Sequence, residues 1–315
     1  MWKYILKRLL LTIPILLAVV FIVFTLLYFA PGDITIQMLG TQWTPEAAAA
    51  LKHELGLDLP FFVQFINYIG GIFTGNLGIL FMSREPVAAM LAVCLPNTLY
   101  ILVTSVTLAV VISIPIGILA ALKPNSWFSG FTTAFSLIGV SAPAFWVGLL
   151  LVLLFSLRLG WLPASGLESP AALILPAVTM SLTYLASLSR TTRSSMIEAM
   201  RMDYIRTARA KGVKQHSIIF KHALRNALLP TVSLIGFIIG EMFGGATIVE
   251  TIFGIPGMGR LLVESVNKRD MNPVLGCVTV MAIGVALMSI LTDVAFAFLD
   301  PRIKAQYVSG GKSHG

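Results

Sequence analysis

The sequence predicts an all-α integral membrane protein with six transmembrane helices. Three observations point to this class: 57% of the 315 residues are hydrophobic, only 11% are charged, and the mean hydropathy is +0.89. A soluble domain has about 25% charged residues, so this chain has too few polar side chains to cover a water-facing surface. The same composition excludes a disordered chain, and two cysteines are too few for a disulfide-rich secreted fold.

Six apolar runs are long enough to cross about 30 Å of hydrocarbon, which takes about 20 helical residues. In chain order, the predicted spans are 9–32, about 99–122, 131–154, 171–188, 228–249 and about 271–299. An outer-membrane strand would need only about 10 alternating residues, so these solid apolar blocks indicate helices. The first run is longer than the apolar part of a signal peptide, and we expect it to be retained as an anchor.

Basic residues lie mainly on one side of these spans. The side of the two chain ends has 16 Lys and Arg residues, and the opposite side has 6. Because positive charge accumulates in cytoplasmic loops, both termini are predicted to lie in the cytoplasm.

The predicted organisation has four parts. Residues 1–30 hold the cytoplasmic N-terminus and the first span, 31–98 form an extracytoplasmic segment, 99–300 form the transmembrane core, and 301–315 are a cytoplasmic tail. In the outer segment, Thr44 is placed to cap a helix that starts at Pro45. A second amphipathic stretch, 61–73, is expected to lie on the outer surface of the spans.

The core contains one large inner loop, 190–225, with nine basic residues. Asp203 is expected to cap a short helix, 204–211, that ends at Gly212, because glycine tolerates the left-handed backbone of a helix end. About 12 Å of helix is too short to be stable alone in water, and Tyr204, Ala208 and Gly212 share a face that could dock on a partner. From charge alone, the simpler interpretation is that the loop fixes topology and contacts anionic lipid.

Three stretches of this loop carry a family resemblance: RTTRSSM at 190–196, DYIRTARAKG at 203–212 and HALRNALLP at 222–230. They resemble the cytoplasmic coupling loop of bacterial ABC importer permeases, most closely the dipeptide/oligopeptide/nickel branch. Further similar stretches follow the same order along the chain: LGLDLP at 55–60, LPNTL at 95–99, LPASG at 162–166, VET at 249–251, Arg269-Asp270 and LDPR at 299–302. The resemblance favours a partner-docking loop over a loop that only contacts lipid.

The resemblance implies a type I ABC importer permease, a multi-pass protein of the bacterial inner membrane. It would form half of a translocation pathway for peptides or a similar solute. The implied partners are a homologous second permease in a heterodimer, two ABC ATPase subunits, an extracytoplasmic solute-binding protein and membrane lipid, without nucleic acid. ATP would be bound by the partner subunits, so no cofactor, no catalytic residue and no resident metal are expected here. Chelated nickel or another metal as the solute stays open.

The resemblance also implies which residues couple the subunit to the ATPase. They are Asp203, Tyr204, Arg206, Thr207, Ala208, Arg209, Ala210, Lys211 and Gly212. The broader importer motif begins Glu-Ala-Ala where this chain has Arg206, Thr207 and Ala208, so the coupling role is expected without the acidic contact.

Glu241 lies about 18 Å into the fifth predicted span, where an ionised acid costs roughly 2.5–3.5 kcal/mol. It should therefore face protein or water. Two interpretations stay open: a pathway-lining group that meets a cationic end of the substrate, or a carboxyl in the hydrated outer third. A proton-coupled secondary transporter that uses Glu241 as its carrier is the alternative from another class, and the single acid in this span counts against it.

Smaller features of the spans have two interpretations each. Ser141, Pro143 and Phe145 could mark a helix break near the pathway, and a harmless proline kink is the simpler interpretation. Glycines at 236, 240 and 244 predict close helix packing, with a flexible gate as the alternative. Cys94 and Cys277 are expected to be buried free thiols rather than a disulfide.

Overall fold

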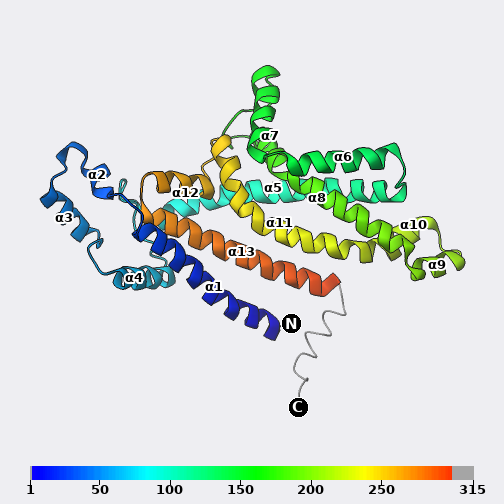
Figure 1. Cartoon of the computed structure of the whole chain (residues 1–315), viewed down its shortest axis with the longest axis horizontal. Coiled ribbons are helices and arrows are strands. Elements are labelled where there is room, and N and C mark those ends of the chain that lie inside the picture. The colour runs from blue at the N-terminus through cyan, green and yellow to red at the C-terminus, as the bar shows by residue number, and fades with distance from the viewer. Residues whose placement is uncertain (1, 300–315) are drawn as a thin grey trace, which may run out of the picture.

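The structure, a computed structural model, describes the backbone of residues 2–299 and confirms the all-helical fold (Figure 1). In that range five helical segments are long and apolar enough to cross a membrane, and a bent pair provides a sixth span if it is counted as one. The long helices are α1 (Trp2–Tyr28), α5 (Val87–Leu122), α8 (Ile174–Arg201), α11 (Leu224–Ile252) and α13 (Met271–Leu299). The predicted tail, 301–315, lies outside the described residues.

Shorter helices connect the long ones. They are α2 (Ile34–Leu39), η1 (Gly40–Gln42), α3 (Pro45–Glu54), α4 (Phe61–Thr74), α6 (Trp127–Ser141), α7 (Ala144–Leu151), η2 (Val152–Arg158), η3 (Pro170–Leu173), α9 (Asp203–Ala210), α10 (Gln215–Ser217), η4 (Ile218–Ala223) and α12 (Met258–Asn267). The predicted cap of α3 is confirmed, because the Thr44 hydroxyl accepts from the backbone N–H of Ala47 at 3.2 Å. The amphipathic stretch is α4, which packs on the outer end of α1 through Phe61 and Phe65.

Two helices extend further than the predicted spans. Helix α5 begins at Val87, directly after Pro86, and α8 continues past the predicted end at residue 188 to Arg201. The additional part of α8 is amphipathic and buries Thr192, Met196 and Ala199. Hydropathy marks the part of a helix that lies in lipid, and the packed polar end of α8 lies beyond that part.

The third span is two helices joined at a sharp bend. Helices α6 and α7–η2 meet at 104° around Ala142 and Pro143, and α7 projects away from the long helices in Figure 1. Pro143 has no N–H to continue the helix and forces Ala142 into an extended conformation with ψ 124°. The simpler interpretation, a harmless proline kink, is therefore wrong, because the helix breaks at this point.

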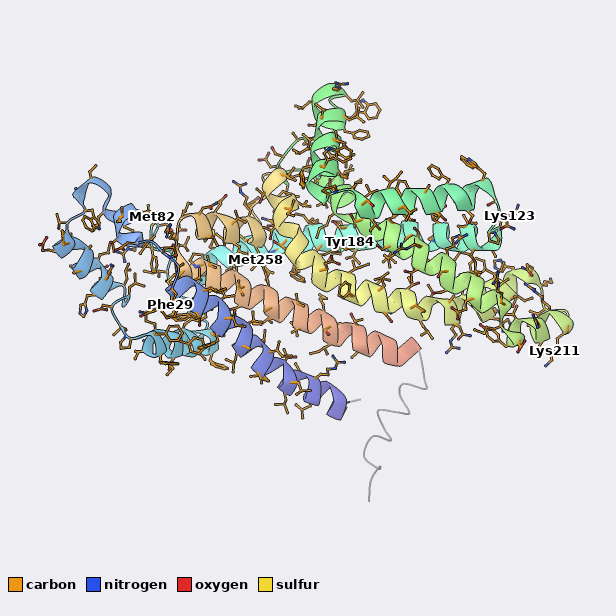
Figure 2. The ribbon with its side chains drawn as sticks, viewed as in Figure 1. Phe29, Met82, Lys123, Tyr184, Lys211 and Met258 are labelled. Atoms are coloured by element: carbon orange, nitrogen blue, oxygen red, sulfur yellow. The ribbon has the colours of Figure 1, made fainter. Side chains whose placement is uncertain are left out.

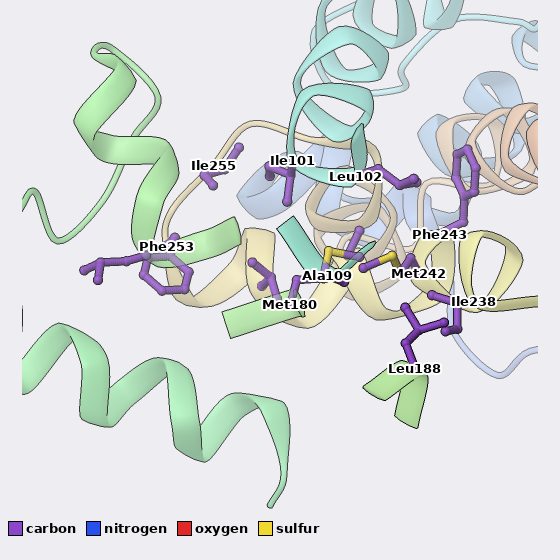
Figure 3. Close-up of a cluster of buried hydrophobic side chains, with 13 residues drawn as sticks. Ile101, Leu102, Ala109, Met180, Leu188, Ile238, Met242, Phe243, Phe253 and Ile255 are labelled. Carbon is purple, nitrogen blue, oxygen red and sulfur yellow. The ribbon is translucent and has the colours of Figure 1, made fainter. Parts of the chain in front are cut away.

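Helix α8 occupies the centre of the bundle, where it contacts α5, α6, α7 and α11. The central core lies between α5, α8 and α11, with Ile101, Met180, Met242 and Phe243 among its buried side chains (Figure 3). Helix α1 lies at the edge against α13 and α4. The basic loop with α9 and α10 lies at one end of the bundle beside Lys123, and Phe29 and Met82 lie at the other (Figure 2).

The glycine ridge on α11 is a packing surface for α13 over two of its three positions. A Cβ on Gly236 would overlap the Thr292 side chain, and one on Gly240 would lie 3.5 Å from Val285. Gly244 has no neighbour within 4 Å. Cys94 and Cys277 are both buried free thiols, as expected.

Candidate functional site

The inner end of the bundle presents α9, an eight-residue helix with one buried face. Ile205 and Ala208 are buried among Met196, Ile218 and Ala223, and this cluster also reaches Ile118 of α5 and Ala227 of α11. The inner ends of α5, α8 and α11 therefore share one buried cluster with this short helix, which packs directly on α8 and η4. A force on α9 would reach all three long helices through these contacts.

The opposite face of α9 is exposed and basic. It carries Tyr204, Arg206, Thr207, Arg209, Ala210 and Lys211, with Asp203 at the start of the helix. The predicted docking face of Tyr204, Ala208 and Gly212 is wrong at Ala208, which faces the bundle of its own subunit. Spacing alone could not show which side of so short a helix is covered.

The ends of α9 differ in how well they were predicted. Asp203 is the first residue of the helix rather than its cap, and the N-cap is Met202, which makes no side-chain capping bond. The Asp203 carboxylate instead lies 3.6 Å from the Arg206 guanidinium. Gly212 has φ +73° as predicted, and the next N–H, of Val213, donates to the carbonyl of Ala208 at 3.2 Å.

Hydroxyl groups join α8 to its neighbours above the inner cluster. Arg193 donates to Ser129 Oγ of α6 at 2.8 Å, Ser136 and Ser189 lie 3.3 Å apart, and Thr192 bonds Thr231 of α11 at 3.2 Å. Gly117 of α5 lets Thr192 approach closely, because a Cβ there would overlap this side chain. Helix α8, which leads directly into α9, is thus bonded to two neighbouring helices.

Glu241 belongs to an exposed stripe that runs along most of α11. The exposed positions are Ser233, Phe237, Glu241, Gly244, Ile248 and Thr251, a helical spacing of three or four residues. Three of these six residues are polar, whereas the side of a helix that contacts lipid is expected to be apolar. The spacing was readable in the sequence, but only the structure shows that this face of α11 is unpacked in the single subunit.

The other predicted pathway residues lie at the bend between α6 and α7. Ser141, Pro143 and Phe145 are all exposed in the single subunit, and the Ser141 hydroxyl donates to the carbonyl of Leu137 at 2.9 Å. Among the described residues, no hydrogen bond or ion pair joins these side chains to Glu241. Within the described residues, no cluster of three or more His, Cys, Asp or Glu side chains could hold a metal ion.

A buried carboxyl group joins three helices at the outer end, and sequence reasoning missed it. Glu250 of α11 is fully buried, and its Oε1 accepts from the Thr98 hydroxyl of α5 at 2.6 Å. Its Oε2 accepts from the N–H of Arg260 in the first turn of α12, at 2.9 Å. A Cβ on Gly257 would overlap this carboxyl, which explains the glycine in the turn before α12.

Three features define a helical membrane permease. They are the apolar spans, a short inner helix that shares a buried cluster with three of them, and a partly polar stripe along α11. The comparisons identify its family. The family described as "Binding-protein-dependent transport system inner membrane component" matches residues 113–305, and its N-terminal part matches residues 1–102. The chain therefore belongs to this family of inner-membrane permeases, which are transporters rather than enzymes and work with ATPase and binding-protein partners.

Relatives extend over nearly the whole chain. The oligopeptide transport system permease protein AppB of Bacillus subtilis (strain 168) is 37% identical and covers 96% of this chain and 100% of its own. The dipeptide transport system permease protein DppB of Alkalihalophilus pseudofirmus is 35% identical, and the glutathione transport system permease protein GsiC of Salmonella typhimurium is 39% identical, each over 96% of this chain.

A solved structure confirms the fold of the core. The inward-facing MetNI methionine ABC transporter matches with a TM-score of 0.57 and 17% identity, over 67% of this chain and 96% of that chain. At this identity the similarity concerns the fold alone.

Proposed function

We propose that this chain is a permease subunit of an ATP-driven importer whose solutes are peptides. The observation that carries the proposal is the near full-length similarity to permeases of oligopeptide, dipeptide and glutathione transport systems. None of these relatives is described as a nickel permease, and the family leaves no basis for a proton-coupled carrier. ATP is bound by the partner ATPases rather than by this chain.

The exposed face of α9 supports the proposed coupling role of residues 203–212. Five of its exposed side chains are polar or charged, and its buried face is anchored in the inner cluster. In this proposal the ATPase contacts the exposed face, and closure of the ATPase dimer moves α8, α5 and α11 together. The basic residues of the loop support a cytoplasmic location for this end, and in this proposal both termini lie on the same side.

A second, homologous permease completes the pathway in this proposal. The exposed stripe of α11 holds an acid that lipid would not accommodate at low cost, so it faces a water-filled path between the two subunits. The bend at Pro143 and the exposed side chains of Ser141 and Phe145 line the same path. Glu241 meets the cationic amino end of a peptide there.

The test is import by the assembled complex in proteoliposomes, with binding protein, ATP and radiolabelled trialanine. We expect ATP-dependent uptake that stops when the ATPases are omitted. Glu241→Gln should lower uptake of trialanine more than uptake of N-acetyl-trialanine, which has no ammonium group. Uptake that continues without the ATPases contradicts the importer, and equal uptake by Glu241→Gln and the unmodified protein contradicts the role of Glu241.

A further inference from the structure

A cavity of about 710 Å³ opens at the outer end of the subunit. It lies where the segment after α1 meets the end of α12 and the start of α13. Its charged lining residues are Asp33, Lys52, Arg269 and Asp270. Neither the coupling helix nor the α11 stripe contributes to this cavity.

Arg269 holds a backbone conformation that suits glycine. Its φ is +56°, and it follows the last turn of α12, where its N–H donates to Val266 and the N–H of Asp270 donates to Ser265. Glycine is the usual residue at such a helix end, and a side chain there costs roughly 1 kcal/mol. An arginine in this place indicates that the guanidinium group itself is used.

The Arg269 side chain lies against the backbone of Gly32, where a Cβ would overlap the guanidinium group. It is exposed and has no ion pair with any described residue. Arg84 provides a contrast: it also has a positive φ, of +61°, but its guanidinium lies 3.1 Å from a carboxylate oxygen of Glu54. Of these two arginines with a positive φ, Arg269 is therefore the one without an ion-pair partner among the described residues.

The acids of the cavity do not neutralise Arg269. Asp33 pairs with Lys52 at 2.6 Å. Asp270 is only 4% exposed, and its Oδ2 accepts from the N–H of Phe81 at 2.7 Å. Its Oδ1 has no hydrogen-bond partner among the described side chains and is also closed off from solvent, so among the four charged lining residues Arg269 is the one that is both unpaired and accessible.

We propose that this cavity binds a carboxylate, with Arg269 as its cationic partner. A guanidinium group can bond both oxygens of a carboxylate, which makes it well suited to this ligand. Carboxylates reach the outer face from two sources: the C-terminus of a peptide, or an acidic side chain of the solute-binding protein. The proposal rests on the proposed function, in which this end of the subunit faces the outside of the cell.

The test compares Arg269→Gly with Arg84→Gly in the complete complex in lipid nanodiscs. Both substitutions place glycine at a positive φ, so both should leave the unfolding temperature unchanged or higher, and only the first removes the unpaired cation. Calorimetry measures binding of trialanine and of its C-terminal amide. A second titration measures affinity for the purified solute-binding protein at low and high salt.

Two outcomes support the site and separate the sources. If the carboxylate belongs to the peptide, trialanine binds at least tenfold more tightly than its amide, and Arg269→Gly removes this difference. If it belongs to the binding protein, trialanine does not bind, and Arg269→Gly weakens binding-protein affinity about tenfold at low salt and less at high salt. Arg84→Gly should behave as the unmodified complex in both titrations.

The proposal is overturned if Arg269→Gly changes neither peptide binding nor binding-protein affinity, or if Arg84→Gly has an equal effect. ATP-dependent uptake of trialanine is measured on the same preparations. If the unmodified complex shows no ATP-dependent uptake, the proposed function is contradicted. The binding measurements would still decide whether Arg269 binds a carboxylate.

Discussion

The hydroxyl of Thr98 and the carboxyl of Glu250 share a buried hydrogen bond of 2.6 Å, and each also binds α12. Thr98 Oγ1 accepts from the N–H of Met258 at 2.8 Å, and Glu250 Oε2 accepts from the N–H of Arg260. Two side chains from α5 and α11 thereby satisfy the free N–H groups at the start of a third helix, which otherwise have no partner inside it.

Removal of either side chain should destabilise this junction. Thr98→Val leaves the N–H of Met258 and one carboxylate oxygen without their partner, which costs roughly 1–3 kcal/mol for each buried group. We expect a lower unfolding temperature of the assembled complex in detergent. Thr104→Val is the matched control, because the Thr104 hydroxyl bonds only carbonyls of its own helix. Equal unfolding temperatures for Thr98→Val and Thr104→Val would contradict the prediction.

A tryptophan on the exposed face of α9 should separate docking from folding. Ala210→Trp adds bulk to an exposed position, so the unfolding temperature of the permease should hold while co-purification with the ATPase falls about tenfold. Ala208→Trp overfills the buried cluster and should instead destabilise the permease by roughly 1–3 kcal/mol. Normal ATPase binding by Ala210→Trp would show that the ATPase does not contact this face.

Gly236 should be the least replaceable glycine of the α11 ridge. Gly236→Ala places a methyl group on the Thr292 side chain, and overpacking of this kind costs roughly 1–3 kcal/mol. Gly244→Ala meets no neighbour within 4 Å and should be neutral or stabilising by up to about 1 kcal/mol. Thermal unfolding of both variants checks the order, and Gly236→Ala with Thr292→Ala should recover stability.

His53, on the outer face, should have a higher pKa than an unperturbed histidine. Its Nδ1 lies 2.7 Å from the Asp58 carboxylate, and this hydrogen bond raises the pKa of His53 above 6.5. Any stability from the pair is therefore fully present below pH 6.5 and is lost as the pH rises through the raised pKa. Histidine ring NMR signals should show this pKa fall to about 6.5 in Asp58→Asn, and His53→Gln assigns the signal. An unchanged pKa in Asp58→Asn would contradict the pairing.

Local chemistry made some parts of this protein readable from sequence. Apolar runs predicted the membrane helices. Thr44 predicted the start of α3 and Gly212 the end of α9, because capping depends on residues within a few positions of the helix end. The helix break followed from the missing N–H of Pro143. Its 104° angle did not, because a bend angle depends on what both halves pack against.

Other parts depended on residues far apart in the sequence. Ala208 is buried because Met196 and Ala223 lie beside it, and no spacing within α9 reveals that. The Glu250 junction joins positions 98, 250 and 258, and the left-handed conformation of Arg269 runs against its residue type. These features depend on tertiary contacts. They cannot be predicted from the charge of one side chain or from the spacing of residues in one helix.

The bend at Ala142 and Pro143 also bears on how the subunit is made. Each half of that span has 15 residues, about 22 Å of helix, which is too short to cross the bilayer alone. The last carbonyls of α6 have no donor within their own helix, and hydrocarbon supplies none. If a second permease covers this bend, as the proposed function requires, a newly synthesised subunit carries carbonyls without a donor until that partner binds. Under that proposal, the amount of the second permease limits how much of this chain persists in the membrane.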